Sequence, residues 1–200
     1  KKIEKIKSIS QNNKVTFAMV LLSIYGDIIS RWNDSEKFMV SVPINNHIEE
    51  NKSLVAELTD IVLIPLDYTN LYSFIDKVNM VKKNFYEAMK HRSYSGVKLQ
   101  KYLIKNGWDY GHIAPFVFSS YYETDFFDIK FLNNIGKLKY MKTQTPQVWN
   151  DFQIYKFDDG LTFIWDYVDE LFPDGMVDLM FDKFVQYLDW LTDQANWNGF

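Results

Sequence analysis

The carboxylate with the strongest case for chemistry is Asp151, in the stretch TQTPQVWNDFQ that runs from Thr143 to Gln153. Trp149 and Phe152 beside it favour burial, and the stretch contains no Lys or Arg to neutralise the acid. A buried carboxyl group without strong donors keeps its proton to a higher pH, and raised pKa values gather where proton transfer is needed. Asp151 is therefore a candidate general acid or base.

A structural role for Asp151 is open as well. The Thr145-Pro146 pair reads as a turn or a sheet edge, and a carboxylate beside a bulge there could simply accept backbone N–H bonds. Hydrophobic periodicity alone favours this structural alternative over a catalytic one.

Two hydroxyl side chains form the second candidate feature. Ser119 and Ser120 end the apolar run from Ala114 to Ser120, which predicts a buried strand. Side chains at the end of such a strand often face a cleft. The hydroxyls could therefore meet a ligand, and Ser119 is kept as a candidate site residue.

The sequence gives little support for a metal site, a serine nucleophile, a nucleotide site or an aromatic ligand platform. His47, His91 and His112 have no metal-ligand spacing, so we interpret all three as structural and expect no metal site. No serine lies in a G-x-S-x-G elbow and no glycine-rich phosphate loop is present. The aromatic runs favour core packing over a sugar or cofactor platform, because aromatic side chains bury large areas.

Composition limits the class of protein. The chain has 200 residues, 47% of them apolar, which is enough for one domain or lobe with its own core. The net charge of −4 offers no basic field for a phosphate backbone, so we expect no nucleic-acid partner. No apolar run approaches the roughly 20 residues of a membrane span, and no secretory signal opens the chain. Cysteine is absent, which fits a reducing cytoplasm, and the abrupt start suggests a piece of a longer protein.

Apolar periodicity predicts the elements that must position these side chains. Helices are expected over residues 1–10, 16–32, 73–89, 97–105 and 177–191, with N-caps at Thr16 and Ser73 and with Pro173 in the first turn of the last helix. Strands are expected over residues 38–44, 60–68, 114–120 and 161–168, with one or two more between residues 137 and 155 and a hairpin turn at residues 157–160.

These elements together predict an α/β fold of the α+β kind, a mixed sheet with helices packed on it. The run from Asp60 to Tyr68 is apolar on both sides, as a central strand would be, although Pro65 indicates an edge or a bulge. Residues 1–192 are expected to form the lobe, and residues 193–200 to begin a linker.

Several segments resemble the C-terminal half of the heterocyclisation domains of nonribosomal peptide synthetases. The family motif is Ser/Thr-Gln-Thr-Pro-Gln-Val, two further residues and usually Asp, followed thirteen residues later by Trp-Asp. Here the motif is spelled by residues 143–148 and Asp151, and Trp165-Asp166 follow after residues 152–164. This spacing is highly specific. The family strand Pro-Val-Val-Phe-Thr-Ser is similar to residues 115–120, with Ser119 where the family has Thr.

The weaker segments fall in the family's order, so the resemblance spans about residues 16–191. They are the helix ending at Trp32, Glu57-Leu58-Thr59, residues 91–97 and Glu170-Leu171-Phe172-Pro173. The resemblance implies a chloramphenicol-acetyltransferase-like lobe, one of two that enclose an active-site tunnel. The paired aspartates of the family belong to the N-terminal lobe, which this sequence does not contain, so half of an active site is expected here.

The resemblance also implies a reaction and partners. The family condenses an upstream acyl or peptidyl thioester with carrier-bound Cys, Ser or Thr, and then cyclodehydrates the amide to a thiazoline or oxazoline. No directly bound cofactor is implied, because the substrates are carried on the phosphopantetheine arms of carrier domains. The implied partners are the N-terminal lobe, the upstream and downstream carrier domains and the adjacent adenylation domain.

The resemblance assigns the acid/base role to Asp151 and an orienting role to Ser119, while Thr145, Gln147 and Trp149 either line the tunnel or serve packing. An ordinary condensation lobe that makes only amides is one alternative. A non-catalytic lobe that docks carrier and adenylation domains is another, although the acid at Asp151 and the hydroxyl at Ser119 argue against it.

Overall fold

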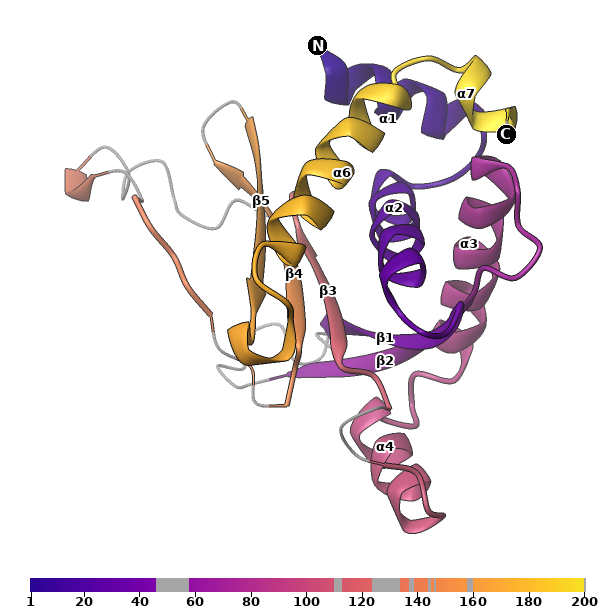
Figure 1. The fold of residues 1–200 in the computed structure, drawn as a ribbon, viewed down its shortest axis with the longest axis vertical. Coiled ribbons are helices and arrows are strands. Elements are labelled where there is room, and N and C mark those ends of the chain that lie inside the picture. The colour runs from indigo at the N-terminus through magenta and orange to yellow at the C-terminus, as the bar shows by residue number, and fades with distance from the viewer. Residues whose placement is uncertain are drawn as a thin grey trace, which may run out of the picture.

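A five-stranded mixed sheet forms the centre of the molecule (Figure 1). The computed structural model describes residues 1–45, 58–109, 113–123, 134–136, 139–143, 145, 147–157 and 160–199. The strands are β1 (Lys37–Asn45), β2 (Thr59–Asp67), β3 (Phe116–Tyr121), β4 (Asn150–Phe157) and β5 (Gly160–Tyr167), in the order β2-β1-β3-β4-β5. The three inner strands run parallel and both edge strands are antiparallel to their neighbours, so the mixed α/β fold expected from the sequence is confirmed.

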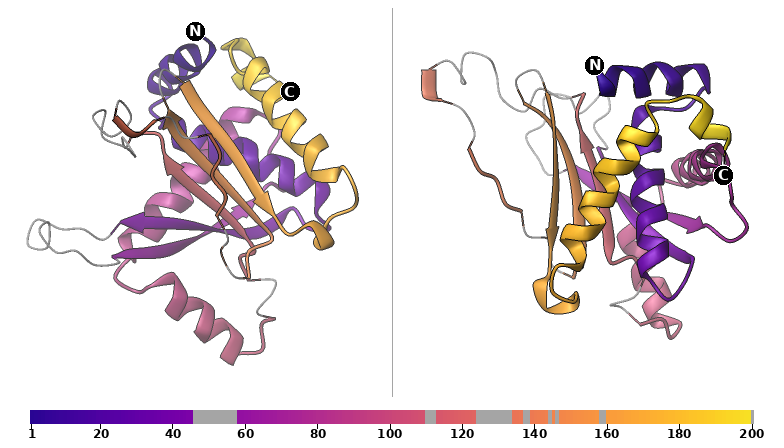
Figure 2. Two further views of the ribbon diagram at one scale, coloured as in Figure 1. Left: turned by 90° about the vertical axis from the view of Figure 1, so that its left-hand side faces the viewer. Right: turned by 45° about the horizontal axis from the view of Figure 1, so that its top comes forward.

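One face of the sheet carries the main core. The helices on this side are α1 (Lys2–Asn12), α2 (Phe17–Trp32), α3 (Phe74–Lys90), α6 (Met176–Trp190) and α7 (Ala195–Asn198) (Figures 1 and 2). Helix α2 is the most buried of them, as its apolar sequence predicts. Each strand sends every second side chain into this core, for example Val40, Phe118, Phe152 and Trp165.

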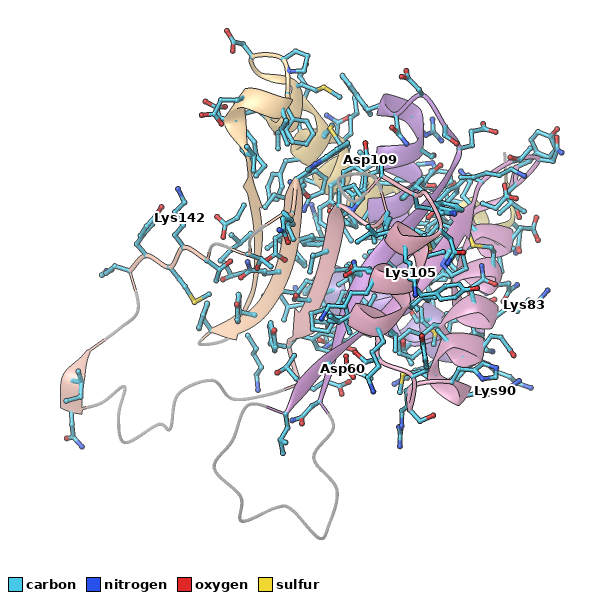
Figure 3. The ribbon with its side chains drawn as sticks, turned by 90° about the horizontal axis from the view of Figure 1, so that it is seen from below. Asp60, Lys83, Lys90, Lys105, Asp109 and Lys142 are labelled. Carbon is cyan, nitrogen blue, oxygen red and sulfur yellow. The ribbon has the colours of Figure 1, made fainter. Side chains whose placement is uncertain are left out.

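The opposite face has a second, smaller apolar cluster. Helix α4 (Gly96–Lys105) covers the β1–β2 side of this face, where Leu99 and Leu103 pack near Leu63 of β2 (Figure 3, where Lys105 marks the helix). The central position suggested for residues 60–68 is therefore wrong. β2 is an edge strand, as Pro65 indicated, and it is apolar on both faces because α3 covers one face and α4 the other.

Both predicted N-caps are confirmed. The Thr16 hydroxyl accepts a hydrogen bond from the Met19 amide at 3.2 Å, and the Ser73 hydroxyl accepts one from the Asp76 amide at 3.2 Å. Each bond satisfies one of the free N–H groups at a helix start and so fixes where the chain enters the helix.

Two boundaries differ from the sequence prediction. The stretch around Asp151 becomes a strand only at Asn150, because Gln147 adopts a left-handed conformation with φ 66° and the Trp149 ring packs against Phe116. Pro173 lies before α6 instead of in its first turn, since Gly175, with φ 74°, interrupts the helical backbone between them.

The end of the described chain packs on the lobe. Trp197 of α7 is fully buried and meets Phe74 edge-to-face, with 5.2 Å between ring centroids. The proposed boundary between lobe and linker at residue 192 stays a prediction. Within the described residues no single helix is long and apolar enough to cross a membrane; only α1 and α2 taken together reach that length and composition, and a bend of 102° separates them.

Candidate active site

Strand β4 separates its side chains by polarity. Asp151, Gln153 and Tyr155 point to the face opposite the main core, while Phe152 and Ile154 enter that core. The spacing D-x-Q-x-Y follows the two-residue repeat of a strand, so the three polar groups form one row. Gln153 of this row donates to Thr143 of the arm, the name used here for residues 139–143, which extend along that side of the sheet (Figure 2).

Asp151 is a buried carboxyl group with an unusual lack of donors. Only 7% of the residue is exposed. Its Oδ2 accepts a hydrogen bond from the Gln153 amide nitrogen at 2.9 Å, and its buried Oδ1 has no partner among the described residues. The residue pairs regularly with Val117 of β3 and Asp166 of β5, so no bulge is present at this point. The contacts therefore do not support the structural alternative of a carboxylate satisfied by backbone N–H groups.

A second carboxylate lies directly across the ladder. Asp166 faces Asp151 in the β4–β5 register, and its Oδ2 accepts hydrogen bonds from the amide and the hydroxyl of Thr143, both at 3.0 Å. The Gln153 amide also reaches Asp166 Oδ2 at 3.4 Å and donates to the Thr143 hydroxyl. Tyr155 donates to Gln153 Oε1 at 2.7 Å, which turns the NH₂ group of Gln153 toward the acids.

These surroundings raise the pKa of Asp151 from 3.8 to about 6. Burial is the largest cause, because it disfavours the charged form, and the negative charge of Asp166 acts in the same direction. The hydrogen bonds from Gln153 and Thr143 oppose this rise because they stabilise the carboxylate. Asp151 can therefore both accept and donate a proton near neutral pH.

Ser119 lies on the neighbouring strand and on the same face. It is 5% exposed and pairs with Gln153 in the β3–β4 register, so it is one diagonal step along the sheet from Asp151. No direct hydrogen bond joins the two side chains in the part of the chain that the structure describes. The sheet thus brings Ser119 and Asp151 to one face, although Ser119 does not line the cavity beside Asp151.

Of the three residues predicted to bind substrate, only Thr145 lines the cavity beside Asp151. Thr145 is exposed and lines a cavity of about 320 Å³ together with Asp151, Asp166, Thr143 and Val148. Trp149 instead packs edge-to-face on Phe116 at the start of the strand, with centroids 6.0 Å apart, so its described contacts serve packing. Gln147 is exposed in the turn before it and does not line this cavity.

The hydrogen-bond network around Asp151 includes residues that were not chosen from the sequence, among them Gln153, Tyr155 and Asp166. The alternation D-x-Q-x-Y could have indicated the first two. The predicted hairpin could have indicated the third, because pairing Phe157 with Gly160 and counting back six residues puts Asp151 opposite Asp166.

The one histidine that the structure describes, His91, does not line this cavity. His91 is exposed at the end of α3 beside Glu87, and His47 and His112 lie outside the described residues. Among the side chains that the structure describes, no group of three or more His, Asp and Glu could hold a metal ion.

Asp151→Asn is expected to stabilise the fold at neutral pH. A carboxyl group whose pKa is higher in the folded state gives its full stability only below about pH 4, and this stability is lost as the pH rises through about 6. The loss is at most about 3 kcal/mol, and Asn avoids it because Asn does not titrate. Urea unfolding of the two proteins should give similar free energies at about pH 4 and a higher value for the variant above pH 7. A difference that does not change with pH would contradict the raised pKa.

Comparisons with known proteins agree with this fold. The condensation domain family model matches residues 1–197. The chain is 29% identical over 195 residues to pyochelin synthetase PchE of Pseudomonas aeruginosa, covering 96% of this chain and 13% of the relative. It is 27% identical over 191 residues to phenyloxazoline synthase MbtB of a Mycobacterium species, covering 92% of this chain and 16% of the relative. The chain thus spans less than a fifth of these curated relatives.

A solved structure gives the same result. The cyclization-docking bidomain of the nonribosomal peptide synthetase EpoB from Sorangium cellulosum superposes with a TM-score of 0.81 at 27% identity, covering 96% of this chain and 39% of that one. The resemblance noted in the sequence is confirmed, and with a family model matched from residue 1 to residue 197, the chain belongs to the condensation domain family.

Proposed function

We propose that this chain is the C-terminal lobe of a heterocyclisation domain, which forms an amide between carrier-bound substrates and then closes a thiazoline or oxazoline ring. One observation carries the proposal. Asp151 is a buried acid with a pKa of about 6 and an Oδ1 atom free of described partners, and it belongs to the motif that the heterocyclisation family shares. The names of the relatives support it, since one is a phenyloxazoline synthase and one solved neighbour is a cyclization domain.

Ring closure needs a group that moves protons between heteroatoms. In the first step the side-chain thiol or hydroxyl of the acceptor residue attacks the amide carbonyl carbon. Asp151 takes the proton from the attacking atom and returns it to the former carbonyl oxygen, which gives a hemiaminal. In the second step Asp151 takes the proton of the ring nitrogen and delivers it to the hydroxyl, which leaves as water while the C=N bond forms. One carboxyl group with a pKa close to the working pH serves both steps.

Ser119 would orient the oxygen that becomes the leaving group. Its hydroxyl lies on the same sheet face as Asp151, on the next strand, and it can donate to the carbonyl oxygen or accept from the hemiaminal. Serine lacks the methyl group that restricts χ1 in threonine, so its hydroxyl is held less firmly.

The substrates and partners follow from this role. We propose that both substrates arrive on phosphopantetheine arms of upstream and downstream carrier domains, that an N-terminal lobe completes the tunnel, and that an adenylation domain adjoins the lobe. No cofactor held by the lobe itself is part of the proposed reaction.

The proposal is tested by reconstitution of the complete two-lobed protein with both carriers loaded. Intact-mass spectrometry of the downstream carrier should show a product lighter than the amide by one water. An ordinary condensation domain would release only the amide, and a docking lobe would leave both substrates uncondensed. Either of these results would overturn the proposal.

The proposed role of Ser119 is tested by two variants in the same reconstitution. Ser119→Ala should slow the loss of water about 10-fold or more, because the leaving oxygen loses a hydrogen-bond partner. Ser119→Thr restores the hydroxyl and should retain the wild-type rate. Equal rates for the Ala variant and the wild type would remove Ser119 from the site.

A further inference from the structure

The acid pair Asp151 and Asp166 is not symmetric in its hydrogen bonds. Asp166 Oδ2 is surrounded by three donors, from the Thr143 amide, the Thr143 hydroxyl and the Gln153 side chain. Asp151 Oδ2 accepts from Gln153, Thr143 also stabilises the charged form of Asp151, and Oδ1 has no partner among the described residues. A negative charge is therefore better compensated by hydrogen bonds at Asp166 than at Asp151.

Gln153 has one fixed orientation in this group. Because its Oε1 accepts from Tyr155 at 2.7 Å, its NH₂ group must face the two acids. That NH₂ group holds Asp151 Oδ2 at 2.9 Å and so fixes the orientation of the carboxyl group, whose buried Oδ1 has no partner among the described residues. The backbone register fixes the acids opposite one another, independently of side-chain rotamers.

We propose that Asp166 and Gln153 are positioning residues for ring closure: Asp166 makes the Asp151 carboxylate a stronger base by like-charge repulsion, and Gln153 anchors Asp151 Oδ2 and so fixes the orientation of the carboxyl group that transfers the proton. Neither residue touches the reacting atoms in this assignment. The inference rests on the proposed acid/base role of Asp151 and assigns a cause to its proton affinity.

Among the described residues, few other charged or titratable groups lie around Asp151. Tyr155 lies in the same row of β4, and Tyr25 of α2 approaches from the core side, where its hydroxyl donates to Asn150 Oδ1 at 2.7 Å. Lys142 of the arm, Tyr167, Asp169 and Glu170 line the same cavity. Lys142 is exposed (Figure 3), and so are Asp169 and Glu170, so solvent screens their charges more than that of Asp166. Of these acids, Asp166 is the one whose negative charge raises the pKa of Asp151.

The test is the pH dependence of ring closure in the complete two-lobed protein. The rate should fall on the acid side as Asp151 becomes protonated, with wild type at half its maximum near pH 6. Asp166→Asn removes the like charge, so this midpoint should move about one pH unit lower. Gln153→Met removes the donor that favours the carboxylate, so the midpoint should move higher.

Shifts of the pH midpoint in opposite directions in the two variants indicate positioning roles, because general damage to the fold would lower the rate at every pH. Asp174→Asn makes the same charge change at an exposed residue before α6 and should leave the midpoint unchanged. If Asp166→Asn folds poorly, the upward shift of Gln153→Met still decides the case. Midpoints equal to wild type in the variants that fold would overturn the inference.

Failure of this inference can be told from failure of the proposed function. If Asp151→Asn closes the ring at the wild-type rate, the proposed function itself fails and the positioning roles fail with it. If Asp151→Asn stalls ring closure while the acid-side midpoints of the other variants do not move, the positioning roles alone are wrong.

Discussion

Asp151→Asn is expected to slow ring closure by about 10²–10⁴-fold, the usual contribution of a positioned acid/base group. Asn has nearly the same shape as Asp and keeps an oxygen that Gln153 can hold at its present 2.9 Å. It cannot take a proton from the attacking thiol or hydroxyl, nor return one to the leaving oxygen. The first stage, amide formation, does not depend on this proton transfer in the proposed mechanism and should stay within a few-fold of wild type.

The product distribution checks this expectation. With both carriers loaded, the variant should accumulate the uncyclised amide on the downstream carrier, whereas wild type should carry the ring. Glu is a useful companion variant, since Asp151→Glu keeps the proton transfer but lengthens the side chain and should recover part of the ring product. An Asn variant that loses amide and ring equally would assign Asp151 to binding or to folding.

Removal of Asp27 is expected to cost the fold about 3–5 kcal/mol, because it leaves a buried charge without its partner. Asp27 of α2 is 3% exposed and its Oδ1 accepts from Lys77 of α3 at 2.8 Å, while the Lys77 residue is itself 5% exposed. Arg31, one turn further along α2, donates to Oδ2 at 3.2 Å. Asp27→Ala should therefore lower the midpoint of urea unfolding strongly.

An exposed ion pair of the same length gives the matched control. Lys2 and Asp189 are 2.7 Å apart, but both side chains are more than half exposed. Asp189→Ala should change stability far less, since solvent and salt already screen that pair. The double replacement Asp27→Leu with Lys77→Met should recover much of the lost stability, because neither charge then remains buried. Equal losses for the two single variants would contradict a special role for the buried pair.

Local chemistry allowed much of the fold to be predicted from the sequence. The apolar spacing between Thr16 and Trp32 predicts a helix, and the cap at Thr16 needs only a hydroxyl and the amide three residues later. The place of β2 at the edge of the sheet could not be predicted in this way. Its two apolar faces result from the packing of α3 on one face and α4 on the other, and an apolar pattern alone does not distinguish such a strand from a central one.

In the candidate site, too, local sequence predicts some residues, while the positions of others depend on tertiary packing. Asp151 could be selected because an acid among apolar residues is unusual, but its partners depend on how strands pair. Ser119 reaches the same surface only because β3 and β4 run parallel in one register. Trp149 could not be placed by pattern, since the left-handed turn at Gln147 decides that its ring packs on Phe116. The assignment of substrate-binding roles to Thr145, Gln147 and Trp149 stays a prediction.

The most direct test of the central role of Asp151 supplies the condensed but uncyclised amide already attached to its carrier. Wild type and Asp151→Asn in the complete two-lobed protein are then compared for the loss of water alone, by intact-mass spectrometry over time, so that amide formation plays no part. The account predicts that wild type converts this amide to the ring and that the variant does so at least about 100-fold more slowly. Ring closure at equal rates by the two proteins would contradict it.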